Sequence, residues 1–116
     1  MTWLADVADE PYAYLTTTGR VTGRPHEIEI WFATDGTSAW LLADSRDDAD
    51  WVRNLRRDPA VTLRIADHSV AAQARVVAEG TDEDARARDA LWRKYGQHRD
   101  DLTTWRDSAL PVAIDL

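Results

Sequence analysis

The chain has 116 residues, of which 44% are hydrophobic, and it contains no cysteine. This length predicts one domain, residues 1–116, with enough apolar residues for a core. The formal net charge of −7 argues against a nucleic-acid partner, because binding phosphates needs a cluster of Lys and Arg. There is no long apolar run and no basic-then-apolar leader, so we expect no membrane insertion, no disulfide framework and a cytoplasmic location.

Three strands are predicted in the first part of the chain. Residues Ala13–Thr18 are rich in aromatic and β-branched side chains, and His26–Phe32 alternates between polar and apolar side chains. The dipeptide Asp35-Gly36 is a strong turn signal in front of a third strand, Ser38–Ala43. These runs predict an antiparallel meander of three strands.

The turn between the first two strands, residues 18–26 (TGRVTGRPH), is the most informative segment. Gly19 and Gly23 permit a positive φ or a close backbone approach. Arg20 and Arg24 carry guanidinium groups, which together with free backbone amides are suited to a phosphorylated ligand. On these residues alone, a solvated basic turn is the competing interpretation.

A short helix is expected over about residues 48–57, followed by the helix-ending pair Asp58-Pro59. The acidic side chains at 47, 48 and 50 suit the N-terminal end of a helix and supply its N-cap. The same acids would oppose an anion bound there unless they point away. Trp51 and Leu55 give this helix an apolar side.

The second half predicts three more strands and a longer helix. Val61–Ile65 and Val70–Val77 alternate and form a hairpin, and Leu110–Leu116 is a final strand. Thr81 begins a capping box that opens a helix over 82–95. Six strands and two helices predict a mainly β fold, a small Greek-key-like barrel with helices packed on its outside.

Several blocks of residues, in chain order, resemble the deazaflavin-dependent nitroreductase and F420H2-dependent quinone reductase family. The resemblance covers nearly the whole chain. It implies a split β-barrel of the type that binds flavin mononucleotide (FMN), with the deazaflavin F420 in a groove. The implied enzyme gives hydride from F420H2 to a small-molecule quinone, nitroaromatic or enone acceptor. The blocks are Leu15–Pro25 (LTTTGRVTGRP), Ala43-x-Ser45, Trp51-x-x-Asn54-Leu55 with Pro59 and Val61, and Tyr95 with Trp105 and residues 110–112 (LPV).

The resemblance also implies the residues of the site. Tyr95 and His98 fall where the family places its substrate pocket, and either side chain can give a proton to the product, which makes them the implied catalytic residues. The resemblance implies that the cofactor's phosphate, acidic tail and ring are bound by the turn at residues 18–26 and by the helix expected over about residues 48–57 and the residues just before it. The implied cofactor-binding residues are Arg20, Thr22, Gly23, Arg24, Pro25, His26, Ser45, Arg46, Trp51 and Asn54.

The sequence allows an alternative for the cofactor, for the function and for three of these residues. Val21 and His26 occupy positions that are often basic in the family, so two contacts to an acidic tail are missing and FMN is the alternative cofactor. A non-catalytic binder of a flavin or deazaflavin is the alternative function. Trp51 and Asn54 have a structural interpretation as well, as a core aromatic and a helix residue bonded to a neighbouring loop. Tyr95 has one too, as a core residue at a helix end.

The remaining candidates are less specific. Tyr12, Tyr14 and His68 can also carry a proton, but the three histidines lack metal-ligand spacing, so no metal site is expected. Glu27 and Glu29 share one face of a strand, which either points to solvent or lines a barrel or dimer groove. Six tryptophans are many for this length, and covering them favours a homodimer.

Overall fold

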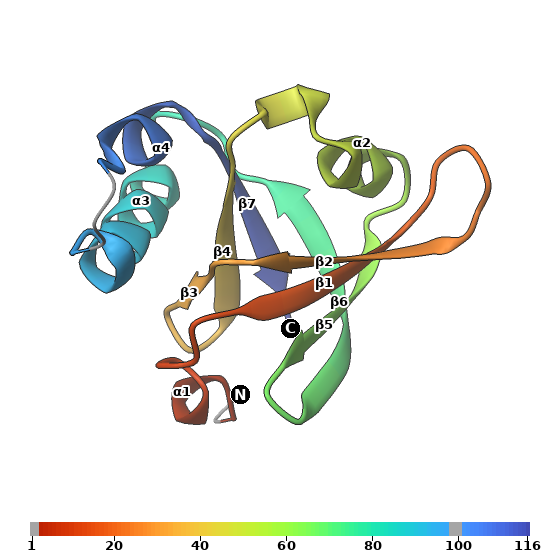
Figure 1. The fold of residues 1–116 in the computed structure, drawn as a ribbon, viewed down its shortest axis with the longest axis horizontal. Coiled ribbons are helices and arrows are strands. Elements are labelled where there is room, and N and C mark those ends of the chain that lie inside the picture. Colours follow the sequence, from red (N-terminus) through yellow and green to blue (C-terminus); the bar gives the residue numbers. More distant parts are fainter. Residues whose placement is uncertain (1–2, 98–100) are drawn as a thin grey trace.

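The computed structural model describes residues 3–97 and 101–116. These residues form a seven-stranded sheet with the order β2-β1-β5-β6-β7-β4-β3, in which all neighbouring strands are antiparallel. The sheet curls into an open half-barrel (Figure 1). The strands are β1 Ala13–Thr18, β2 Pro25–Ile30, β3 Ala33–Thr34, β4 Ser38–Ala43, β5 Ala60–Ile65, β6 His68–Val76 and β7 Leu110–Asp115.

Helices flank the curled sheet on several sides. The helices α3 and α4 lie together at one end, and α2 lies beside the base of the protruding β1–β2 hairpin (Figure 1). The short α1 lies near the turn between β5 and β6. The helical segments are α1 Trp3–Asp6, a 3-10 turn η1 Arg46–Asp48, α2 Asp50–Arg57, α3 Asp82–Tyr95 and α4 Thr103–Ser108. Each described helix is too short to cross a membrane.

The hydrophobic core divides around the sheet. The main cluster fills the half-barrel with fully buried side chains such as Leu15, Leu41 and Leu63. A second cluster packs Leu91 and Tyr95 of α3 against the outer side of β4 and β7. The expectation of a mainly β split barrel with flanking helices is confirmed, with seven strands instead of six.

The predicted three-strand meander is wrong. Strand β2 ends at Ile30 and pairs with β1 at one edge of the sheet, whereas β4 pairs with β7 near the other edge. The reason lies at Phe32, whose backbone N–H donates to the Tyr95 hydroxyl at 3.2 Å and whose carbonyl accepts from Lys94 Nζ at 3.0 Å. These bonds to α3 replace a strand ladder, so the chain leaves β2 and crosses to the short β3.

The two predicted helices begin differently. Helix α3 has the predicted N-cap, because Thr81 Oγ1 accepts from the Asp84 backbone N–H at 3.2 Å and the Asp84 carboxylate accepts from the Gly80 N–H at 2.9 Å. Helix α2 does not have the acidic cap that the sequence predicted. Its N-cap is Ala49, with no side-chain hydrogen bond, and the η1 turn precedes it.

Candidate functional site

Two neighbouring grooves meet at Trp51, which lines both of them. The first, here called the aromatic groove, has a volume of about 530 Å³. The second, here called the turn groove, has a volume of about 420 Å³. The aromatic groove is lined by Tyr12, Glu29, Ile30, Trp31, Leu42, Ala43, Asp44, Ser45, Ala49, Trp51, Leu102 and Trp105. The turn groove is lined by Gly19, Arg20, Val21, Thr22, His26, Glu27, Ile28, Asp50, Trp51 and Asn54.

The β1–β2 turn uses its two glycines as the sequence predicted. Gly23 has a φ of +74°, and its N–H donates to the Gly19 carbonyl at 2.8 Å. A Cβ at Gly19 would lie 2.7 Å from His26 Nε2, so the missing side chain lets the imidazole lie against the turn. The backbone amides of Val21 and Thr22 have no acceptor among the residues that the structure describes. The turn therefore presents amide donors at the groove.

Arg20 ties this turn to helix α2. Its guanidinium donates to Asn54 Oδ1 at 2.9 Å and pairs with Asp50 at 3.1 Å, and its backbone N–H donates to the same Asn54 oxygen at 3.1 Å. Asn54 is only 4% exposed and donates from Nδ2 to Thr17 Oγ1 at 3.1 Å. The structure thus gives Asn54 the bond to a neighbouring loop that was one of its two interpretations.

The acidic residues at the start of α2 are each paired with an arginine. Asp47 accepts from Arg56 at 2.7 Å, and Asp48 pairs with Arg53 at 3.2 Å. Asp50 pairs with Arg20, as described above. These exposed pairs add little stability, but they balance the charge that would otherwise repel an anion.

The first amides of α2 are left for another partner. In the described chain, the backbone N–H groups of residues 50, 51 and 52 have no acceptor, and Ala49 offers no side-chain oxygen. The first turn of a helix carries a partial positive charge through such amides. Because Ala49 and Trp51 line the aromatic groove and Asp50 lines the turn groove, this helix end lies between the two.

Of the other predicted cofactor residues, some lie at the grooves and some do not. The exposed Arg24 side chain has no ion pair or hydrogen bond within the described residues, and its backbone N–H donates to Thr22 Oγ1 at 3.2 Å. Pro25 begins β2, and Ser45 lines the aromatic groove. Arg46 lines neither groove, because its guanidinium donates to the Ser108 carbonyl at 2.7 Å and pairs with Glu79.

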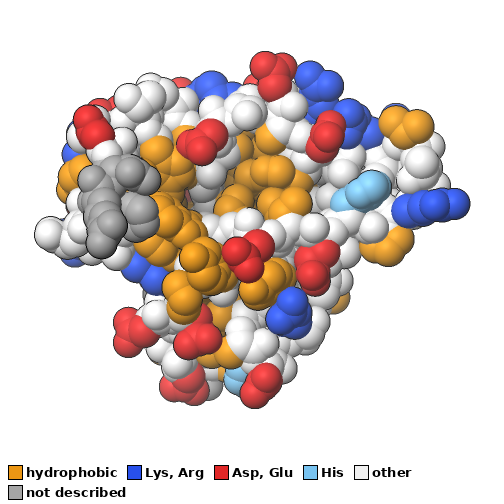
Figure 2. All heavy atoms as spheres, in the orientation of Figure 1, with side chains coloured by type: hydrophobic (Ala, Val, Ile, Leu, Met, Phe, Trp, Pro, Cys, Tyr) orange, Lys and Arg blue, Asp and Glu red, His pale blue; other side chains and the backbone are white. Residues whose placement is uncertain are grey.

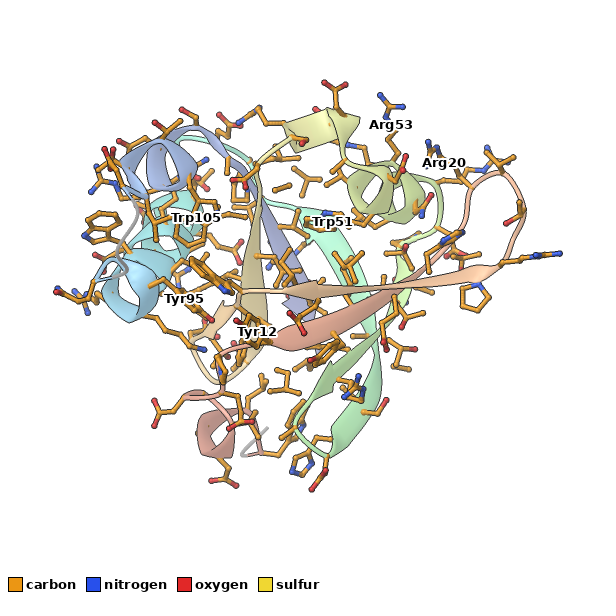
Figure 3. The ribbon with its side chains drawn as sticks, in the orientation of Figure 1. Tyr12, Arg20, Trp51, Arg53, Tyr95 and Trp105 are labelled. Atoms are coloured by element: carbon orange, nitrogen blue, oxygen red, sulfur yellow. The ribbon has the colours of Figure 1, made fainter. Side chains whose placement is uncertain are left out.

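Aromatic side chains line opposite sides of the aromatic groove. Figure 2 shows hydrophobic side chains gathered around a hollow on this face, with acidic side chains bordering it. Figure 3 shows Trp105 beside α3 and α4, across from Trp51 beneath α2, with Tyr12 lower in the view between them. Trp31 stacks on Tyr95 with ring centroids 4.3 Å apart and meets Trp105 edge-on at 5.5 Å. This arrangement suits a flat ring.

Of the predicted catalytic pair Tyr95 and His98, Tyr95 lies within the described residues. The Tyr95 hydroxyl is held by backbone, donating to the Pro11 carbonyl at 2.8 Å and accepting from the Phe32 N–H. Burial raises the pKa of Tyr95 to about 12, and the residue does not line the aromatic groove. His98 lies outside the described residues. A catalytic role for either residue stays a prediction.

The other proton carriers are placed clearly. Tyr12, 41% exposed, lines the aromatic groove, whereas Tyr14 donates to Glu29 at 2.7 Å and His68 stacks on Trp3. The hydrogen bond to Glu29 raises the pKa of Tyr14. Glu29 itself lines the aromatic groove, so its strand face is not simply solvated. The sequence offered both interpretations of that face and no signal to choose between them.

Comparisons with known proteins agree on the fold. The family model of the F420H(2)-dependent quinone reductase matches residues 5–116. A conserved hypothetical protein from Mycobacterium tuberculosis is 26% identical and aligns over 97% of this chain and 77% of its own, with a TM-score of 0.75. An F420-H2 dependent reductase is 20% identical over 91% of this chain and 94% of its own, with a TM-score of 0.72. The heme storage protein HutZ from Vibrio cholerae is 13% identical and aligns over 97% of this chain and 87% of its own, with a TM-score of 0.78.

These matches differ in what they establish. The reductase and the heme storage protein are distant in sequence, so they show a shared fold alone. The family model, in contrast, matches the sequence over nearly its whole length, including the β1–β2 turn, helix α2 and both grooves. The chain belongs to the F420H2-dependent quinone reductase family.

Proposed function

We propose that this protein is an F420H2-dependent reductase that reduces a small aromatic or quinone-like acceptor. The observation that carries the proposal is the pair of grooves joined at Trp51, one lined by aromatic rings and the other by a turn rich in amide donors. A deazaflavin has the matching parts, a flat ring and a phosphate joined by a flexible chain. The family match favours F420 over FMN.

The residues present fit such a cofactor. The phosphate would be held by the amides of Val21 and Thr22 and by the uncapped start of α2, which all lack acceptors in the described part of the chain. Arg24 is free to meet an acidic tail, because its side chain has no described partner. The ring would lie against Trp51 in the aromatic groove.

The chain's own residues would then orient the reactants and exclude water. When bound, the reduced deazaflavin supplies a hydride, which together with one proton reduces the acceptor by two electrons. Trp31, Trp51 and Trp105 form apolar walls that keep water from the reacting face. Tyr12 lines the same groove, and its hydroxyl would donate the proton.

Side-by-side titration of the purified protein with F420 and with FMN tests this function. We expect binding of F420 at least about tenfold tighter than that of FMN, together with loss of F420H2 absorbance when a quinone or nitroaromatic is added. Replacing Tyr12 with Phe should lower kcat by about tenfold with little change in F420 affinity. Preferential binding of FMN would refute the cofactor assignment.

A second candidate function is a non-catalytic cofactor binder. It is favoured by the Tyr95 hydroxyl, which is committed to the backbone of Pro11 and Phe32 and lies outside the groove lining. The fold similarity to a heme storage protein is compatible with it. Tight F420 binding without oxidation of F420H2 by any of the three acceptor classes would support the binder over the enzyme.

We also propose a homodimer, because Trp31, Trp51 and Trp105 are only partly buried in one copy. A second copy would cover apolar surface near the groove. Light scattering with size exclusion checks the mass, and a monomer at micromolar concentration would overturn this assembly. The cytoplasmic location stays an expectation.

A further inference from the structure

We propose that the aromatic groove selects acceptors that carry a positive charge next to a flat ring. This inference rests on the proposed function, because it assigns the substrate class of the same groove. It comes from the charges of the groove lining and from the angles between its rings.

Two carboxylates line the aromatic groove without a basic partner. Glu29 accepts a hydrogen bond from the Tyr14 hydroxyl at 2.7 Å, and Asp44 is exposed. Neither carboxylate has an ion pair, and no Lys or Arg belongs to the groove lining, within residues 3–97 and 101–116. The described lining of the groove therefore carries two carboxylates and no basic side chain, and the described guanidinium that lies over the ring of Glu29's partner Tyr14 is that of Arg64, which pairs with Glu27.

This pattern sets the aromatic groove apart from its surroundings. Glu27 lies two residues before Glu29 on β2, on the same face of the strand, and pairs with Arg64 at 3.7 Å. The carboxylates at 47, 48 and 50 all pair with arginines. Within the described residues, Glu29 and Asp44 therefore lack the arginine partners that the carboxylates beside the turn groove have.

The rings of the groove complete a site for a cation. Trp31, which stacks on Tyr95 with one face, and Trp105 both line the groove and meet at an interplanar angle of 90°, so their ring planes differ in direction. Trp51 and Tyr12 contribute further ring surface to the lining. Faces of Trp and Tyr attract a cation, and several of them at differing angles suit a quaternary ammonium group.

The energetics favour a cation over neutral and anionic analogues. A neutral ring that fills the groove removes water from Glu29 and Asp44 without replacing the lost hydration. A positively charged group offsets the lost hydration energy of the carboxylates, because it is attracted to both of them and to the ring faces. An anion meets repulsion instead.

Three probes with the same ring test the inference: 4-nitrobenzyl-trimethylammonium, 4-nitrobenzyl alcohol and 4-nitrobenzoate. Isothermal titration calorimetry is run on the protein both without and with F420. We expect the cation to bind about tenfold more tightly than the alcohol at low salt and the benzoate to bind most weakly. The preference should shrink as salt rises toward about 0.5 M, because the charges are exposed.

Variants identify the residues responsible. The double variant Glu29→Gln with Asp44→Asn should reduce the preference of cation over alcohol to about threefold or less, leaving the cation–ring attraction. Asp67→Asn is the matched control, since this exposed residue of the β5–β6 turn lines neither groove. The control should keep the full preference.

The outcomes separate the two proposals. Equal binding of the three probes, or an unchanged preference in the double variant, would overturn the charge selection even if F420H2 is oxidised. A cation preference that the double variant abolishes, in a protein that does not bind F420, would support the charge selection and refute the proposed reductase.

Discussion

The N-terminal ends of α2 and α3 are built in opposite ways. Helix α3 is closed by its own chain, because Thr81 and Asp84 exchange bonds with the backbone at its start. Helix α2 starts at Asp50, after the N-cap Ala49, whose φ of −69° and ψ of 131° are those of an N-cap but whose methyl group accepts no hydrogen bond. The capped helix packs on the outer face of the sheet, and the uncapped one begins between the two grooves.

The difference shows which helix end is available for a ligand. A capped end gains stability from its own side chain, typically about 1 kcal/mol, and has fewer amides to offer. An uncapped end gives up that stability and keeps its amides for an external acceptor. If the start of α2 binds a ligand and the start of α3 is structural, substitutions near the start of α2 should change F420 affinity and those at α3 should change stability alone.

The largest expected effect is at Arg20. Because the Arg20 guanidinium donates to Asn54 and pairs with Asp50, its loss removes these side-chain contacts between the turn and α2 and leaves the backbone N–H bond to Asn54. We expect Arg20→Ala to weaken F420 binding by about 1.5–3 kcal/mol, measured by titration of the cofactor's absorbance or fluorescence. Arg53→Ala is the matched control, since Arg53 projects outward from α2 (Figure 3) and also loses one ion pair. Equal losses in both variants would contradict a special role for the turn.

Loss of the Asn54 side chain should lower the stability of the fold, because this uncharged amide holds buried hydrogen bonds. Replacing it with Ala leaves Thr17 Oγ1 and the Arg20 amide without their buried partner. We expect the free energy of unfolding to fall by about 1–3 kcal/mol, measured by urea denaturation. F420 affinity should fall as well, because α2 and the turn lose their common anchor. A fully stable variant would show that the amide bonds are dispensable.

A pair of reciprocal substitutions tests the caps directly. Ala49→Ser gives α2 a hydroxyl acceptor and should raise stability by about 1 kcal/mol, whereas Thr81→Ala should lower it by about the same amount. Only Ala49→Ser should weaken F420 binding, because its hydroxyl competes for the first amides. Thermal denaturation and cofactor titration of both variants check this. A loss of affinity in Thr81→Ala alone would reverse the roles assigned to the two helices.

The effect confined to alkaline pH, and absent near neutrality, concerns Tyr95 at the end of α3. Burial raises its pKa from 10.0 to about 12, so between these values the folded chain keeps a proton that the unfolded chain has lost. Stability therefore falls as the pH rises through about 10 to 12. The difference in urea midpoint between the parent and Tyr95→Phe should narrow over that range. A constant difference would mean that the hydroxyl titrates normally.

Local signals predicted those parts of the fold that depend on neighbouring residues. Strand Ala13–Thr18 and helix 82–95 match the structure because alternation and a capping box are encoded nearby in sequence. The four-residue α1 and six-residue α4 are too short for periodicity to reveal. The meander failed because Phe32 is bonded to Tyr95 and Lys94, more than sixty residues away.

In the candidate site, too, the features set by neighbouring residues were predictable and those set by distant residues were not. The roles of Gly19 and Gly23 followed from the turn itself. The partners of Asn54 lie 34 and 37 residues away, so the sequence left two interpretations open. Tyr12 lines its groove together with residues of β4 and α4, which are distant in sequence, and no local pattern encodes that arrangement.

The Asn54 side chain has a further consequence for motion in the protein. Because one buried amide bonds both Thr17 in β1 and Arg20 in the turn, neither the turn nor α2 can detach without breaking it. The two segments therefore open as one cooperative unit, and their amide protons should exchange with deuterium at a common rate. A ligand bound between the turn and α2 should slow the exchange of amide protons in both segments at once. The exchange rate in either segment would then report whether a ligand is bound.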